Sequence, residues 1–61
     1  MNIGKTISTL RKEKNMTQSE VADKLGVSYQ AVSKWERDES LPDITLLPEI
    51  ADLFGITIDQ L

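Results

Sequence analysis

Two short amphipathic segments, separated by a turn around one glycine, place the tightest constraint on how this chain can fold. The first begins with TQSE, which has the pattern of a helix capping box. The second begins with Ser28, a residue type favoured at helix N-caps. Gly26 lies between them, where it can adopt the positive φ that often ends a helix. The sequence therefore predicts helices over residues 17–25 and 28–37, joined by a turn so short that they must cross steeply.

The spacing of apolar residues indicates which face of each predicted helix is buried. Ala22 supplies the small side chain needed where two crossing helices touch. Val32 and Trp35 fall on one face of the 28–37 helix, so we interpret Trp35 as a core residue rather than as a base-stacking one. The opposite face of this helix carries Tyr29, Gln30, Ser33, Lys34 and Arg37.

Helical patterns also occur on both sides of this central pair. Ile3, Ile7 and Leu10 recur on one helix face and predict a helix over about residues 2–14. Asn15 follows, and asparagine tolerates the left-handed conformation that ends helices. The sequence therefore predicts that the chain begins with a helix packed against the central pair.

Pro48 decides where the predicted fourth helix starts. Proline is tolerated only near a helix start, where amides lack partners anyway. We therefore predict a helix over 45–54 preceded by a turn at 42–44, in place of a kinked helix that starts at Asp43. Leu46 and Leu53 lie off the inner face of this helix and are equally consistent with partial burial and with a partner surface. A fifth helix begins at Thr57 and has only a few residues. We expect the carboxyl-terminal region to form the contact between two copies, with Ile58 and Leu61 as its apolar candidates.

Sixty-one residues make a single domain, and these patterns predict an all-α fold of four to five compact helices. The chain has no cysteine and no histidine, which removes disulfides, the usual zinc ligands and the common catalytic nucleophile–base pairs. We therefore expect no enzyme activity, no metal and no cofactor. Apolar residues never run beyond two in a row, so we expect a cytoplasmic protein without a membrane segment.

Charge is divided unevenly along the chain. Residues 1–37 hold all seven lysines and arginines and four acidic residues, a net charge of +3. Residues 38–61 hold six acidic residues and no basic one, so the whole chain has a net charge of −3. The basic first part and the acidic second part of the chain form an electric dipole, and only the basic part can approach phosphate.

The stretch MTQSEVADKLGVSYQAVSKWERDESLP resembles the helix-turn-helix of the Cro and phage-repressor (XRE) family. The resemblance extends over nearly the whole chain, including Arg11, the Trp35-Glu36 pair and the sequence LPEIADLFGI. It implies a lambda-repressor-like DNA-binding domain over 1–61, with its helix-turn-helix at 17–37. It further implies that this chain is the N-terminal part of a longer transcriptional regulator of the bacterial or phage type. Such a regulator would bind palindromic double-stranded operator DNA as a homodimer. It also places Arg11 beside Glu36 as a buried or half-buried ion pair.

The same resemblance implies a role for several positions of this sequence. Gln18 would bond a phosphate at the start of the second helix, and Ser28 would cap the recognition helix and touch the DNA backbone. Tyr29, Gln30 and Lys34 stand where family members read bases. The predicted DNA-contacting set is Gln18, Ser28, Tyr29, Gln30, Ser33, Lys34 and Arg37.

Side-chain chemistry agrees with this assignment. The amide of Gln30 can pair bidentately with adenine, and Lys34 can donate to guanine O6 and N7. Tyr29 can pack on a thymine methyl group or bond a phosphate, and Ser33 can do either. We therefore expect sequence-specific DNA binding, with residues 28–37 in the major groove.

The loop that follows the recognition helix departs from the family pattern. Several relatives carry basic residues there, whereas this loop begins with Asp38-Glu39, whose carboxylates cannot clamp phosphate. Together with the negative net charge, this loop leaves open a second function, in which the same fold holds a protein partner as an adaptor. The outward Gln30, Lys34 and Arg37 favour DNA.

Overall fold

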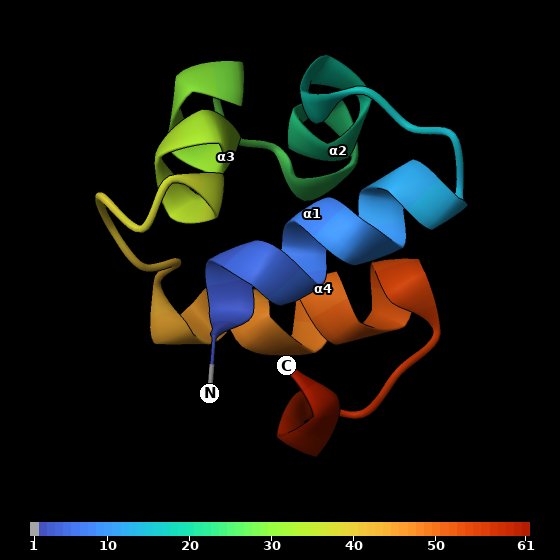
Figure 1. The fold of residues 1–61 in the computed structure, drawn as a ribbon. Helices are drawn as coiled ribbons and strands as arrows, with labels where there is room; N and C mark the ends of the chain where they lie inside the picture. Colours follow the sequence, from blue (N-terminus) through green and yellow to red (C-terminus); the bar gives the residue numbers. More distant parts are fainter. Residues whose placement is uncertain (1) are drawn as a thin grey trace.

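The computed structural model describes residues 2–61, which form four α-helices and two short 3-10 turns without any strand. In the view of Figure 1, α2 and α3 lie on one side of α1, and α4 and the C-terminal turn lie on the other. The predicted all-α fold is confirmed. The elements are α1 (Ile3–Glu13), α2 (Gln18–Leu25), α3 (Tyr29–Glu36), η1 (Ile44–Leu46), α4 (Leu47–Phe54) and η2 (Ile58–Gln60).

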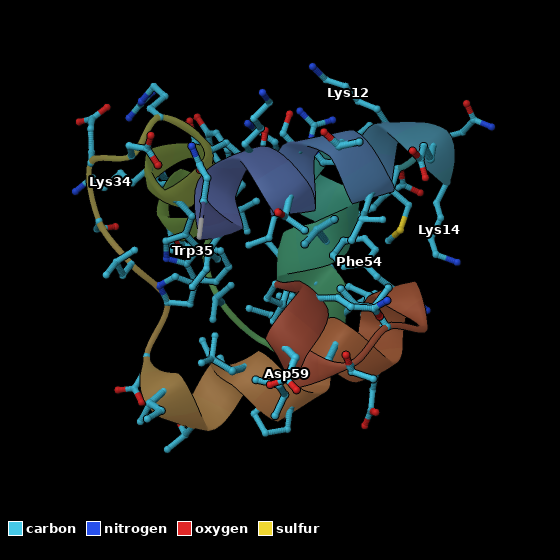
Figure 2. All side chains as sticks on the ribbon, turned by 60° about the horizontal axis from the view of Figure 1, so that its bottom comes forward. Lys12, Lys14, Lys34, Trp35, Phe54 and Asp59 are labelled. Atoms are coloured by element: carbon cyan, nitrogen blue, oxygen red, sulfur yellow. The ribbon has the colours of Figure 1, made fainter. Side chains whose placement is uncertain are left out.

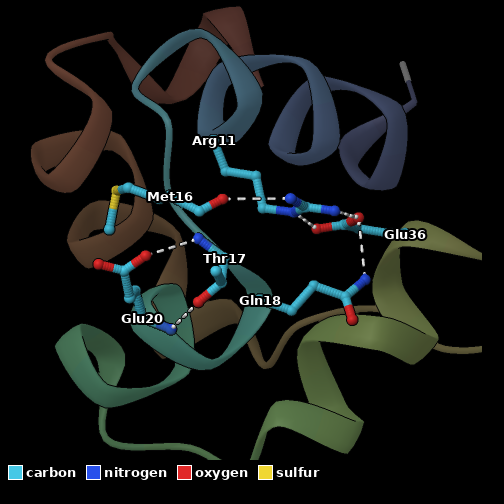
Figure 3. Close-up of polar contacts among 6 residues, drawn as sticks. All are labelled: Arg11, Met16, Thr17, Gln18, Glu20 and Glu36. Atoms are coloured by element: carbon cyan, nitrogen blue, oxygen red, sulfur yellow. Dashed lines mark hydrogen bonds and ion pairs between the residues drawn. The ribbon is translucent and has the colours of Figure 1, made fainter.

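The second and third helices begin where their capping residues predict. The Thr17 hydroxyl accepts a hydrogen bond from the Glu20 amide at 3.0 Å, and the Glu20 carboxylate accepts one from the Thr17 amide at 2.8 Å. These two bonds form the predicted capping box (Figure 3). Ser28 caps α3 by accepting from the Ala31 amide at 3.2 Å. The helices start one residue inside the predicted ranges because those ranges included the caps.

All four α-helices within residues 2–61 are followed by a residue in the left-handed conformation. These residues are Asn15 (φ 56°), Gly26 (φ 71°), Asp38 (φ 60°) and Gly55 (φ 68°). The sequence predicted helix ends at three of these positions, but Asp38 was interpreted only as part of a solvated loop. Asparagine and glycine commonly end helices in this way, whereas aspartate gives a weaker signal.

The end of α3 shows what Asp38 does. Its amide donates to the Trp35 carbonyl at 3.1 Å, and the Glu39 amide donates to the Lys34 carbonyl at 2.9 Å. This pair of bonds is the Schellman motif, which satisfies carbonyls that the end of a helix leaves without partners. The backbone of the loop at Asp38 and Glu39 is therefore fixed against the last turn of α3.

The predicted start of the fourth helix at Thr45 is wrong in detail. The Asp43 carboxylate accepts from the Thr45 amide at 2.9 Å and caps η1, and the α-helix begins only at Leu47. Pro48 has no amide to give to the Ile44 carbonyl four residues before it. The Leu47 amide bonds that carbonyl instead, which produces a tighter 3-10 turn before the α-helix.

The core contains apolar residues from all four α-helices, and Trp35 is only 4% exposed, which confirms its predicted place inside. Leu46 and Leu53 are partly buried against this core. The sequence also suggested Leu61 as part of an exposed dimer surface, but η2 folds back and buries its side chain to 3% exposure. The buried apolar residues are Ile7, Val21, Ala22, Leu25, Val32, Trp35, Ile50, Ala51, Phe54 and Leu61.

Gly4, in the first turn of α1, packs directly against the backbone at the carboxyl end of α3. A Cβ atom at this position would lie 1.9 Å from the Trp35 carbonyl oxygen, well inside contact distance. Only a residue without a side chain therefore lets α1 approach the carboxyl end of α3 so closely. No helix within residues 2–61 is long and apolar enough to cross a membrane.

Candidate nucleic-acid interface

The structure brings most of the predicted site residues onto one exposed surface around α3. Val32 and Trp35 are buried beneath the helix, while Tyr29 on its outer face is 52% exposed. Figure 2 shows Lys34 at the periphery and Trp35 turned toward the interior. Ser33 is half-buried because it lies next to the buried face, so its predicted outward position is only partly correct. The exposed members of the set are Ser28, Tyr29, Gln30, Lys34 and Arg37.

A polar network behind this surface joins α1, α2 and α3 (Figure 3). Arg11 binds Glu36 with two hydrogen bonds, from Nε to Oε2 at 2.7 Å and from Nη2 to Oε1 at 3.0 Å. Its third bond, from Nη1, goes to the Met16 carbonyl at 3.2 Å. The Arg11 and Glu36 side chains are only 15% and 8% exposed. The predicted ion pair is therefore confirmed, and its bidentate geometry is the strong form of this interaction.

The network lowers the pKa of Glu36 below its ordinary value of 4.5. Burial alone raises the pKa of this carboxyl group, because it disfavours the charged form. The hydrogen bonds from Arg11 and Gln18, together with the positive charge of Arg11, outweigh burial and hold the carboxylate ionised. Glu36 therefore remains charged under mildly acidic conditions.

Gln18 is the first residue of α2, and its side chain is tied to the network. Its amide nitrogen donates to Glu36 Oε1 at 3.1 Å, which leaves the second N–H of that amide for another acceptor. The sequence predicted Gln18 as a phosphate contact but did not predict its bond to Glu36, eighteen residues away. Since Glu36 holds the side chain at the start of α2, Gln18 is presented in a fixed orientation.

The end of α3 contains an ion pair that was also not predicted from the sequence. Arg37 Nε donates to a carboxylate oxygen of Glu39, and the two side chains are 57% and 53% exposed. The only sequence signal is opposite charge at a spacing of two residues, which carries little information. Within residues 2–61, this contact and the Arg11–Glu36 pair are the two ion pairs of the fold.

Comparison with known proteins assigns the chain to a family. A family profile described as Helix-turn-helix matches residues 7–61. The chain belongs to the helix-turn-helix family. The resemblance inferred from the sequence is therefore confirmed.

Two relatives are each 39% identical to this chain over all 61 residues. One is the HTH-type transcriptional activator BcrR of Enterococcus faecalis, of which the match covers 30%. The other is the cryptic phage CTXphi transcriptional repressor RstR of Vibrio cholerae serotype O1, of which it covers 54%. The chain thus spans between 30% and 54% of the length of these curated relatives.

Two solved structures share the helix-turn-helix fold closely. The P22 c2 repressor in complex with a synthetic operator aligns with a TM-score of 0.89 at 29% identity, covering 97% of this chain and 89% of that one. SinR, described as a master regulator for biofilm formation and solved in complex with DNA, aligns with a TM-score of 0.83 at 33% identity. That alignment covers 93% of this chain and 92% of SinR.

Proposed function

We propose that this chain binds double-stranded DNA sequence-specifically, as the DNA-binding part of a transcriptional regulator, with α3 in the major groove. The observation that carries the proposal is the two-sided character of α3. Its inner face is anchored by Val32 and Trp35, while its outer face is exposed and able to form hydrogen bonds. A major groove about 12 Å wide admits one such helix. The likeness to two structures solved with DNA supports the same function.

The proposed base contacts lie on the exposed surface of α3. Gln30 can pair with adenine and Lys34 with guanine, since each side chain is exposed and carries donors suited to those base edges. Tyr29 contributes a thymine-methyl contact or a phosphate bond. Ser33 is half-buried and takes a smaller part in this surface.

The proposed backbone contacts come from the edges of the helix-turn-helix. The second N–H of the Gln18 amide bonds a phosphate, beside the positive end of the α2 dipole. Ser28 at the start of α3 and Arg37 at its end contact the sugar–phosphate backbone on either side of the groove. These contacts fix the position of α3 without reading sequence.

We propose that two copies bind one palindromic operator. A single copy presents few cations beside the groove, chiefly Lys34 and Arg37, so one domain alone binds weakly. Because Leu61 is buried, the C-terminal contact suggested from the sequence reduces to Ile58, which is 44% exposed.

Binding sites selected from random duplexes, followed by titration against single-base variants, test the proposal. Gln30→Ala and Lys34→Ala should each cost about 1–3 kcal/mol at one base position and relax the preference there. Gln18→Ala should weaken all sites alike, because it contacts backbone. Thr9→Ala, an exposed change on α1, is the matched control and should leave binding unchanged. If Gln30→Ala weakens every base variant equally, α3 is not the reading helix.

A protein-binding function is the second candidate. Leu41 and Ile44, in and after the loop that follows α3, are 75% and 77% exposed and lie among acidic residues. Where exposed apolar side chains form a contiguous patch, they mark sites of protein binding. Salt separates the two functions, since DNA binding must weaken steeply as salt rises and an apolar interface should not.

A further inference from the structure

We propose that Glu39 sets the DNA affinity of this domain by competing with phosphate for Arg37. The inference rests on the proposed function. In the free domain, Arg37 is held by the Glu39 carboxylate, so a cation at the end of the recognition helix is already compensated. The full charge of this cation is available to DNA only when the contact with Glu39 is broken.

The backbone holds Glu39 in place for this contact. Asp38 takes the left-handed conformation, and the Glu39 amide bonds the Lys34 carbonyl at 2.9 Å. Glu39 is therefore attached to the last turn of α3, and its carboxylate reaches back to Arg37 Nε. The ion pair connects two side chains whose backbone is already ordered, which reduces the conformational entropy lost when they meet.

The exposure of the pair makes it exchangeable. Arg11 and Glu36 are nearly buried, and Arg11 binds its carboxylate with two nitrogens, so that pair stays closed. Arg37 and Glu39 are both more than half exposed, and the contact uses a single nitrogen of Arg37. Exposed pairs of this kind are weak, so a phosphate oxygen can replace the Glu39 carboxylate. The guanidinium binds DNA only in the complexes in which this exchange has taken place.

The neighbouring Asp38 does not share this role. Its Oδ1 atom lies 3.2 Å from the position that a Cβ on Gly4 would occupy, so the carboxylate turns back toward α1. Within residues 2–61, it forms no ion pair with Arg37. The competition is therefore assigned to Glu39 alone.

The test measures binding of the wild-type chain and Glu39→Gln to a duplex selected by the wild type, over a range of salt concentrations. Glu39→Gln should bind about three- to fivefold more tightly at low salt. Its logarithmic salt slope should steepen by up to about 0.9, because Arg37 then neutralises a phosphate in every complex and not only in those in which Glu39 has been displaced. Since the pair is exposed, the melting temperature should change little.

Two further comparisons identify the cause. In an Arg37→Gln background, Glu39→Gln should change affinity by less than about 1.5-fold, because no cation remains to be released. Asp59→Asn alters net charge by the same amount on η2, and Figure 2 shows Asp59 well away from Lys34. This control should leave both affinity and salt slope unchanged.

Each remaining outcome overturns the inference. An equal gain from Glu39→Gln with and without Arg37 would show plain repulsion of DNA, and no gain would show that Glu39 is irrelevant. A gain of the same size from Asp59→Asn would show a general effect of net charge. If the wild type and all variants lack salt-dependent binding to any duplex, the proposed function fails and this inference fails with it.

Discussion

Gly4 shows how one residue can fix the placement of α3, the proposed recognition helix. A Cβ at this position would lie 1.9 Å from the Trp35 carbonyl, which is backbone and cannot rotate away. We therefore expect Gly4→Ala to lower the free energy of unfolding by roughly 1–3 kcal/mol, the usual cost of overpacking.

Urea titration measures this effect. Thr9→Ala, on the exposed side of the same helix, is the control and should be nearly neutral. A Gly4→Ala variant as stable as the wild type would mean that α1 shifts outward at no cost.

Glu36 makes stability depend on pH in acid. Its pKa in the folded state lies below the ordinary value of 4.5 that applies to the unfolded chain. Its stabilising contribution is therefore complete above about pH 4.5 and is lost as pH falls through the folded-state pKa. We expect Glu36→Gln to be less stable than the wild type by roughly 2 kcal/mol at neutral pH, with a smaller difference in acid.

Thermal melts of both proteins across this pH range provide the measurement. A difference that stays constant down to strongly acidic pH would show that ionisation of Glu36 contributes nothing. The sequence indicated the Arg11–Glu36 pair only through the family resemblance. It gave no sign of the Gln18 contact, since residues eighteen apart meet only after the helices have packed.

At the scale of elements, the starts of α2 and α3 were predictable, whereas the start of α4 and the end of α3 were not. Thr17 and Ser28 act on amides three residues away, so local sequence contains the whole signal. The start of α4 depended on whether a 3-10 turn would form before Pro48, and composition does not decide that. Asp38 was missed because aspartate adopts positive φ less readily than glycine.

Asp38→Gly should stabilise the domain. Glycine takes a φ of 60° without steric cost, whereas aspartate there is strained. After allowing for the greater freedom of glycine in the unfolded chain, we expect a gain of about 0.5–1 kcal/mol. A thermal melt checks this against Asp38→Ala, which should give no gain because alanine retains the steric penalty. A lower melting temperature for the glycine variant would show that the Asp38 carboxylate stabilises the first turn of α1.

At the scale of the whole molecule, the separation of charge follows the fold. The elements that face the proposed DNA surface come from the part of the sequence with net charge +3, while residues 38–61 are purely acidic. The sequence predicted this division, but not the burial of Leu61, because the path of the chain after α4 depends on long-range packing.

Two copies on a palindrome should require half-sites about ten base pairs apart, which places the recognition helices ~34–36 Å apart on one face of the duplex. Sedimentation on such a site should give two domains per duplex. Adding about five base pairs between the half-sites turns the half-sites to opposite faces of the duplex. This change should remove any cooperativity between the two bound domains. A one-to-one complex on the palindrome at saturating protein would contradict a dimer.

The contacts of α3 with α1 also govern how the domain opens. Trp35 against Gly4 and Glu36 against Arg11 secure the carboxyl half of α3 to a helix that starts near the beginning of the chain. An eight-residue helix does not persist in water by itself. Amide protons of α3 should therefore exchange with solvent only when the whole domain unfolds, while those of η2 exchange through local fraying. The surface presented by α3 is therefore either fully formed or absent. Any destabilising substitution in the core lowers the folded fraction and so lowers the concentration of molecules that present this surface.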